Sequence, residues 1–284
     1  MFVKRSAVVL IVVTLLALVA GSASAQMVGT IKDVEQPVGT TGKVDWTTGV
    51  ITAVGIGAPP ATPANAAQAR AMAERAAQVV AYRNLLEAVK GVRVDATTTV
   101  ENFMVTSDVI RTEVSGFIQG AMIMDKKYMS DGSVEVTVGM KMSGDLANTL
   151  LPKAATPPTG LTGTLTPATP GQLYTGLIVD ARGLGARPAM APKIVNEDDK
   201  EVYGSAWINR EYAVREGMVG YLKDPLQAQT NPRVTDKPLM VKALKVSGAG
   251  RVDLVISNAD AAMLHSASQN LSMLEKCRVI ILVD

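Results

Sequence analysis

The stretch from Ala64 to Gly91 constrains the fold of this chain most strongly. It holds no proline, and no glycine before Gly91, and residues that form helices at low cost dominate it. Pro63 precedes the stretch and a glycine closes it, as is typical of the two ends of a helix. Runs rich in β-branched residues lie on both sides. The pattern therefore predicts a long helix that covers a sheet.

The predicted helix carries a face of small residues that would let it lie close to that sheet. Helical spacing places on this face Ala69, Ala73, Ala76, Ala77 and Val80. A neighbouring stripe is larger and apolar, and consists of Met72, Val79, Tyr82, Leu86 and Val89.

Strand-like runs surround the helix. Residues 46–57 form one such run, and residues 116–129 and 133–142 form two more that meet at Asp131-Gly132, a good signal for a hairpin. In the last run apolar residues alternate with polar ones, which predicts one buried face. Residues 92–105 are also strand-like, and a short helix is expected over 107–113. The fold class predicted is α+β: an antiparallel sheet covered by a long alanine-rich helix.

The order of these pieces resembles a known family. The matching residues are Ala69, Arg70, Ala73 and Ala76 in the helix, then Gly91-Val92, Val100-Glu101-Asn102, Asp108, Ile110 and Gly116-Phe117-Ile118. Residues 45–150 resemble the N-terminal domain of flagellar assembly protein T and the related twenty-kilodalton outer-membrane lipoprotein family. The resemblance implies an envelope-associated, non-catalytic α+β module, and a flagellar member would contact the rings of the basal body. The chain departs from the family in its second half and in having no lipobox cysteine.

The first residues predict export. Lys4 and Arg5 precede an apolar run, and small residues at Ala23 and Ala25 form a cleavage site, so residues 1–25 read as a signal peptide. The run is shorter than the roughly 20 apolar residues of a membrane anchor. Cleavage would reduce the formal net charge from +2 to zero and leave no transmembrane span, which disfavours nucleic acid as a partner. No cysteine lies near the site, which disfavours a lipid anchor.

Composition divides the remaining chain. Residues 26–44 are polar without a period and predict a flexible lead-in to a domain at 45–150. Prolines recur among threonine and alanine over 151–171, which predicts a semi-extended linker and a domain boundary. Residues 172–284 read as a second domain, α/β or α+β, and resemble no family that we recognise.

A turn in the second domain is the candidate ligand site. A strand ending at Asp180 leads into a Gly-x-Gly turn between two arginines, formed by Arg182, Gly183, Gly185 and Arg187. Such a turn can hold a phosphate or carboxylate on its backbone N–H groups, or can be a plain structural turn. The prolines that follow argue against the helix of a dinucleotide site.

Residue types that support catalysis are scarce. The single histidine, His265, has no Ser, Cys or Asp motif spaced to serve it, and the single cysteine, Cys277, reads as a buried residue of the last strand. Asp198-Asp199 reads as the solvated tip of a hairpin rather than a cation site. We therefore expect no enzyme, cofactor or metal, although a hydrolase built on carboxylates alone stays open.

Two hypotheses of different class follow. The first is an exported protein of the periplasm, associated with the outer membrane, that binds or assembles envelope or basal-body proteins and can self-associate. The second is a periplasmic module that binds an anionic small molecule or glycan at the 180–187 turn.

Overall fold

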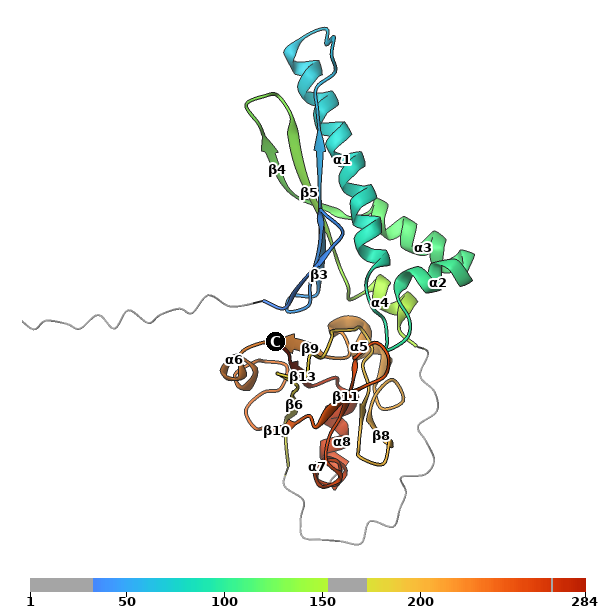
Figure 1. The fold of residues 1–284 in the computed structure, drawn as a ribbon, viewed down its shortest axis with the longest axis vertical. Coiled ribbons are helices and arrows are strands. Elements are labelled where there is room, and N and C mark those ends of the chain that lie inside the picture. The colour runs from blue at the N-terminus through green and yellow to red at the C-terminus, as the bar shows by residue number, and fades with distance from the viewer. Residues whose placement is uncertain (1–32, 153–172, 267) are drawn as a thin grey trace, which may run out of the picture. The chain divides into compact units, whose positions relative to one another are not determined.

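The computed structural model describes residues 33–152, 173–266 and 268–284 (Figure 1). These described residues all belong to one compact unit. The predicted signal peptide, with Ala23 and Ala25, lies outside the described residues, as does the predicted linker apart from its first two positions. None of the described helices is long and apolar enough to cross a membrane.

The N-terminal part, residues 33–152, is an antiparallel sheet with a long helix on one face, as the sequence predicts (Figure 1). The strands lie in the order β1-β2-β3-β5-β4. They are β1 (Glu35–Val38), β2 (Gly42–Asp45), β3 (Val50–Gly57), β4 (Met122–Tyr128) and β5 (Val134–Lys141). Helix α1 (Ala66–Lys90) lies along β3 and β5.

Helix α1 is capped at both ends. The side chain of Asn65 accepts a hydrogen bond from the amide of Gln68, and Gly91 follows the last turn. The buried face is Ala73, Ala77, Ala81, Leu85, Ala88 and Val89, so the predicted face was partly wrong: Ala76 is exposed, and Ala69 and Val80 are half-buried. The face is set by β3, where Gly55 and Gly57 let the helix backbone approach, and a helix pattern alone does not reveal that partner.

The flexible lead-in predicted for residues 26–44 was wrong over residues 35–44. Strands β1 and β2 form an antiparallel hairpin there, and β2 pairs with β3. Val44 is fully buried, and the backbone N–H of Trp46 donates to the carbonyl of Val34. Pairing with the sheet orders a segment whose own sequence shows no period.

The segment after α1 also differs from the prediction. A strand was expected over 92–105, but the structure has one isolated bridge, Arg93 to Thr99, followed by helix α2 (Val100–Thr106). Thr99 and Asn102 form a capping box, which favours a helix that begins at Val100 more strongly than the β-branched composition favours a strand. The helix expected at 107–113 is confirmed as α3 (Asp108–Gln119), which extends into the start of the run that predicted a strand. Helix α4 (Asp145–Leu150) ends this part.

The predicted hairpin at Asp131-Gly132 is confirmed. It joins β4 to β5, and Gly132 adopts a positive φ of 83°. The Asp131 carboxylate accepts hydrogen bonds from the amide and hydroxyl of Ser133, which lower the pKa of that carboxyl. In β5, Val134, Val136 and Val138 are buried on the α1 side as the alternation predicts.

The C-terminal part, residues 173–284, holds two four-stranded sheets. The parallel sheet β10-β6-β13-β9 consists of β6 (Gly176–Asp180), β9 (Gly220–Leu222), β10 (Pro238–Lys242) and β13 (Val279–Leu282). The mixed sheet β11-β12-β7-β8 consists of β7 (Ile194–Val195), β8 (Glu201–Tyr203), β11 (Lys245–Ser247) and β12 (Asp253–Val255). The prediction of a second α/β or α+β unit is confirmed.

Four helices accompany these sheets. They are α5 (Arg210–Glu216), α6 (Pro225–Gln229), α7 (Asn258–His265) and α8 (Ser268–Glu275). The helix expected from Asn258 or Asp260 to about Glu275 is therefore two helices, and its N-cap is Ser257, whose side chain accepts from the amide of Asp260.

Candidate functional site

The predicted anion turn follows β6, but its four residues do not converge on one ligand position. Arg182 forms a bidentate pair with Asp180, with Nε–Oδ1 and Nη2–Oδ2 distances of 2.9 and 2.7 Å. The hydrogen bond from Arg182 holds the pKa of the Asp180 carboxyl below its usual value. The guanidinium is therefore already engaged by a carboxylate of its own strand.

The two glycines of the turn adopt the positive φ angles that glycine tolerates better than other residues. Gly183 and Gly185 have φ of 77° and 64°. The amide of Gly183 donates to the Oδ1 of Asp284 over 2.8 Å, so a protein carboxylate occupies the first position where an anion could sit. The backbone N–H of Arg187 donates to the carbonyl of Arg251.

Gly185 and Arg187 instead line a larger cavity of about 340 Å³. Arg93 and Lys223, which come from other elements, line the same cavity, together with acidic and apolar residues that include Glu35, Asp284 and Trp46. Glu35 is paired with Lys43 at 2.6 Å. Within the described ranges, no ion pair or side-chain hydrogen bond ties Arg93, Arg187 or Lys223 to another residue. Three cationic side chains thus face one cavity.

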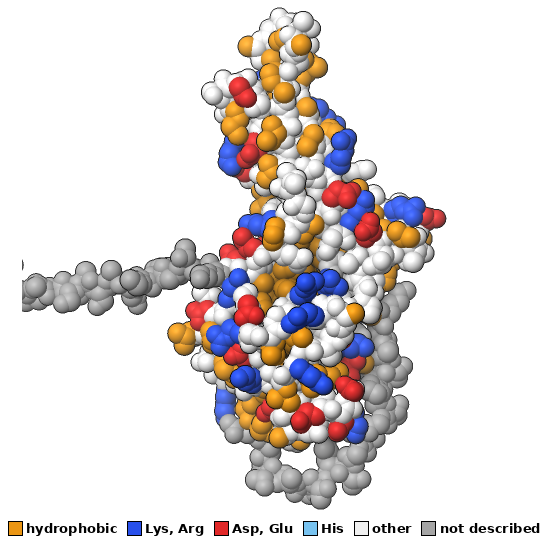
Figure 2. Space-filling view, viewed as in Figure 1, with side chains coloured by type: hydrophobic (Ala, Val, Ile, Leu, Met, Phe, Trp, Pro, Cys, Tyr) orange, Lys and Arg blue, Asp and Glu red, His pale blue; other side chains and the backbone are white. Residues whose placement is uncertain are grey.

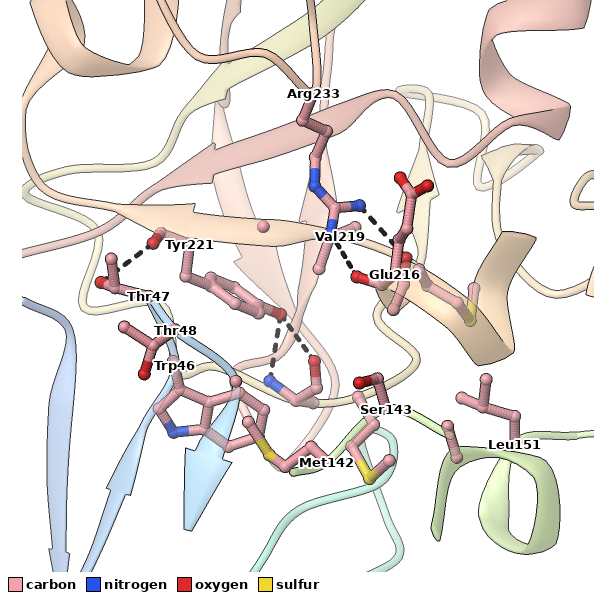
Figure 3. Close-up of a pocket in the computed structure, with 17 residues that line it drawn as sticks. Trp46, Thr47, Thr48, Met142, Ser143, Leu151, Glu216, Val219, Tyr221 and Arg233 are labelled. Atoms are coloured by element: carbon pink, nitrogen blue, oxygen red, sulfur yellow. Dashed lines mark hydrogen bonds between the residues drawn. The ribbon is translucent and has the colours of Figure 1, made fainter. Parts of the chain in front are cut away.

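A second cavity, of about 130 Å³, is lined by side chains from both parts of the chain (Figure 3). Trp46 and Tyr221 meet edge to face with ring centroids 5.7 Å apart. The Tyr221 hydroxyl donates to the carbonyl of Ala189 and accepts from its amide, at 2.9 and 3.0 Å. Burial raises the pKa of Tyr221. These two hydrogen bonds give the buried Tyr221 hydroxyl and both backbone groups of Ala189 a partner.

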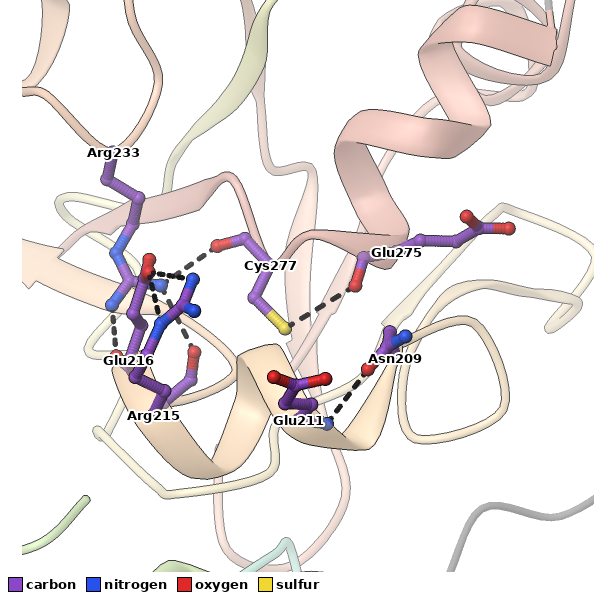
Figure 4. A network of polar contacts seen from close by, with 8 residues as sticks. Asn209, Glu211, Arg215, Glu216, Arg233, Glu275 and Cys277 are labelled. Atoms are coloured by element: carbon purple, nitrogen blue, oxygen red, sulfur yellow. Dashed lines mark hydrogen bonds and ion pairs between the residues drawn. The ribbon is translucent and has the colours of Figure 1, made fainter. Parts of the chain in front are cut away.

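Arg233 borders the second cavity, and its side chain donates hydrogen bonds to the backbone. Its guanidinium donates to the carbonyls of Glu216, Gly217 and Cys277, which lie at the end of α5 and just before β13 (Figure 4). Glu216 in turn pairs with Arg215 at 2.8 Å. The Cys277 thiol is buried, which raises its pKa to about 11. The prediction of a buried, packed cysteine is confirmed.

His265 lies in the last turn of α7 and is half-buried. Its ring packs on Trp207 with centroids 4.9 Å apart, and its Nε2 lies 3.2 Å from the carbonyl oxygen of Val202. Burial lowers its pKa. The residue therefore packs within the fold. Among the described residues no group of three or more His, Cys, Asp or Glu side chains could hold a metal ion.

Among the described elements the edge strand β4 is the most exposed, and the sequence pattern does not predict this exposure. All seven residues of β4 are exposed, and four of them are the apolar residues Met122, Ile123, Met124 and Tyr128. Figure 2 shows apolar and charged side chains next to each other over the end of the molecule formed by α1 and β4. Among the described strands β4 pairs only with β5, so its other side is an open sheet edge, where the amide of Lys126 donates to the Asp125 carboxylate over 2.9 Å.

One face of β4 is tied to α1. Lys126 donates to Glu74 of α1 over 2.5 Å, and the hydroxyl of Tyr128 also donates to Glu74. The Arg70 guanidinium lies over the Tyr128 ring, 4.9 Å from its centroid. The hydrogen bond from Lys126 lowers the pKa of the Glu74 carboxyl. These contacts fix the strand while leaving its outer edge open.

The comparisons with known proteins separate the two parts. Residues 44–141 match the model of the LPP20 lipoprotein family. The resemblance of the first part to outer-membrane lipoproteins is thus confirmed, and it indicates an envelope or outer-membrane location for a protein with an LPP20-like domain. Residues 176–284, which resemble no family by inspection, match the second domain of Treponema pallidum Tp0624. No curated protein matches the chain at a significant level. The exposed strand β4 belongs to the LPP20-like domain.

Proposed function

We propose that the protein is an exported, non-catalytic binding module of the cell envelope that engages protein through the edge strand β4. The observation that carries this proposal is that all seven residues of β4 are exposed, with Met122, Ile123, Met124 and Tyr128 at an open sheet edge. Edge strands of this kind bind a further strand through main-chain hydrogen bonds, and their side chains give specificity. The match to a lipoprotein family of the envelope supports the location.

In-cell photocrosslinking tests the proposal. A photoreactive amino acid placed at Met124 should yield adducts with an envelope protein or with another copy of the chain. The matched control is Val109 of α3, which is also exposed and apolar but lies on a helix. Adducts that contain basal-body proteins would assign the module to the flagellum, and other envelope proteins would assign it elsewhere. Equal adducts from both positions, or none from Met124, would contradict binding through β4.

Export is part of the same proposal and has its own measurement. If the signal peptide is cleaved after Ala25, the intact mass of the protein recovered from the envelope should correspond to a chain that begins at Gln26. A mass that retains residues 1–25 would contradict cleavage there.

A second candidate function is favoured by the cavity of Arg93, Arg187 and Lys223. Three cationic side chains that form no ion pair with another described residue surround this cavity of about 340 Å³, which suits a ligand with a phosphate or carboxylate group. We propose the cavity rather than the turn itself as this site, because Arg182 pairs with Asp180 and the amide of Gly183 donates to Asp284.

Thermal shift with inorganic phosphate and with citrate tests this candidate. Either anion should raise the melting temperature of the wild type, and the double variant Arg187→Ala, Lys223→Ala should lose the rise. The matched control Arg182→Ala should keep it, because Arg182 pairs outside the cavity. Loss of the rise in the Arg182→Ala variant alone would favour the turn over the cavity, and no rise in the wild type would remove the candidate.

A further inference from the structure

From the edge of the LPP20-like domain we propose that β4 pairs antiparallel with β4 of a second copy of this chain, about a two-fold axis at Lys126. This inference rests on the proposed function, because it names the partner of the same strand. An interface of this kind uses one patch twice, so each residue must suit the residue that the two-fold places opposite it. The sequence of β4 meets that requirement.

The charges of β4 are self-complementary in this register. Asp125 and Lys127 lie on the face away from α1, since they pair with Thr137 and Glu135 of β5 while the buried valines of β5 face the helix. Their side chains are 53% and 60% exposed, and within one chain the Nζ of Lys127 lies 3.9 Å from the Oδ2 of Asp125. An antiparallel pair centred on Lys126 places Asp125 of each copy opposite Lys127 of the other. Two cross-strand ion pairs result, and opposite charges at such positions stabilise a sheet.

The remaining charge on the strand does not oppose the pairing. The two-fold places Lys126 opposite its own copy, which would be unfavourable for free lysines. Each Lys126, however, is bound to Glu74 of its own chain at 2.5 Å. Charged residues usually protect an edge strand from pairing. In β4 the same charges disfavour parallel or shifted pairings, in which like charges would meet, and allow the antiparallel pairing in which Asp125 lies opposite Lys127.

The apolar residues fit the same register. The pairing of β4 with β5 shifts between Ile123 and Asp125, which makes Met124 the extra residue of a bulge. If the bulge residue Met124 is left out of the alignment of the two copies, Ile123 of one copy lies opposite Tyr128 of the other. Both residues lie on the face of the sheet that α1 covers, because they pair with the buried valines of β5. Both side chains are exposed in the single chain, so pairing would remove apolar surface from water. The inference thus joins charge and apolar matching in one alignment.

Charge reversal tests the pairing directly. The exported protein should be dimeric by sedimentation equilibrium, and Asp125→Lys or Lys127→Asp alone should weaken the dimer by at least about tenfold, since each puts like charges opposite each other twice. The double variant Asp125→Lys, Lys127→Asp should dimerise again. An equimolar mixture of the two single variants should form the mixed dimer, because one copy then carries two positive and the other two negative residues.

Controls make every outcome decisive. Lys245→Asp reverses an exposed charge on β11, an edge strand of another sheet, and should leave the dimer unchanged. Circular dichroism checks that each variant is folded, which matters for Lys127 because it also pairs with Glu135 at 2.8 Å. A monomeric wild type, a dimer indifferent to the single changes, or no recovery in the double variant and the mixture would each overturn the pairing. The crosslinking test would still judge protein binding by β4 separately, through adducts with a different envelope protein.

Discussion

Gly55 of β3 lies against the backbone of Ala81 in α1. A Cβ atom added to Gly55 would lie 2.2 Å from the amide nitrogen of Ala81 and 2.4 Å from the carbonyl oxygen of Ala77. Gly57 stands in the same relationship to Ala73 and Ala77 one turn earlier. Because the obstructing atoms are helix backbone, they cannot rotate away. The helix and the sheet of the LPP20-like domain therefore pack so closely at Gly55 and Gly57 that no Cβ atom fits between their backbones.

Replacing Gly55 by alanine should destabilise the protein by about 3 kcal/mol, since the methyl group must displace helix α1 from β3. The measurement is the midpoint and slope of urea unfolding. The matched control is Gly116→Ala in α3, where an added Cβ meets nothing within 4 Å. Alanine there should stabilise the helix by about 0.5–1 kcal/mol. A Gly55→Ala variant as stable as the wild type would contradict the close packing of α1 on β3.

Local signals in the sequence predicted the elements that carry them. The run ending at Gly91 became α1, the Asp131-Gly132 turn became a hairpin, and the apolar run after Cys277 became β13. Strands β1 and β2 were missed because they are held by neighbours in the sheet and have no period of their own. The helix α2 was missed because its cap, Thr99 with Asn102, decides its structure against a β-branched composition.

The site was predicted less well than the fold. Arg187 and Gly185 do line a cavity, but Arg93 and Lys223 reach it from distant positions, and no spacing in the sequence connects them. Arg182 and Asp180 are only two residues apart, but the sequence does not show that their side chains point toward each other at the end of β6. β4 is exposed because it is the last strand of its sheet, and the sequence that begins at Met122 does not predict that position in the strand order.

Removing the hydroxyl of Tyr221 should destabilise the chain although the ring stays. That hydroxyl bonds both the amide and the carbonyl of Ala189, all within the buried interior. Tyr221→Phe leaves both backbone groups without this partner and should cost about 1–3 kcal/mol in the free energy of unfolding. Urea unfolding followed by the fluorescence of Trp46 and Trp207 measures it, since Trp46 contacts the Tyr221 ring. A cost close to zero would indicate that the backbone of Ala189 finds another partner.

Acid should weaken the fold through His265. Burial lowers the pKa of His265 below its ordinary value of 6.5, so the unfolded chain binds a proton more readily than the folded one. The stability it contributes is present above pH 6.5 and is lost as the pH falls through the folded pKa. The melting temperature of the wild type should therefore fall between pH 7 and pH 5. His265→Gln, which cannot ionise, should show a smaller fall, and an identical pH profile would exclude this histidine as the cause.

Base should weaken the fold through Cys277. Burial raises the pKa of its thiol from an ordinary 9.0 to about 11. Here the unfolded chain loses its proton first, so the stability is present below pH 9 and declines as the pH rises toward 11. At pH 8 the native thiol is both buried and protonated, and the thiolate is the reactive form. Labelling by a disulfide reagent should therefore be at least about a hundredfold slower than in urea-unfolded protein.

The same labelling experiment distinguishes a thiol that is inaccessible in the native protein from one that is accessible but reacts slowly. If Cys277 reacts only when the chain opens, the labelling rate should rise with sub-denaturing urea. In the destabilised Gly55→Ala variant the rate should rise too, provided that the opening that exposes the thiol is the cooperative unfolding of the whole unit. Gly116→Ala should slow the labelling for the same reason. Fast labelling of native wild type, insensitive to urea, would contradict the buried position of Cys277 and with it the packing of the last strand.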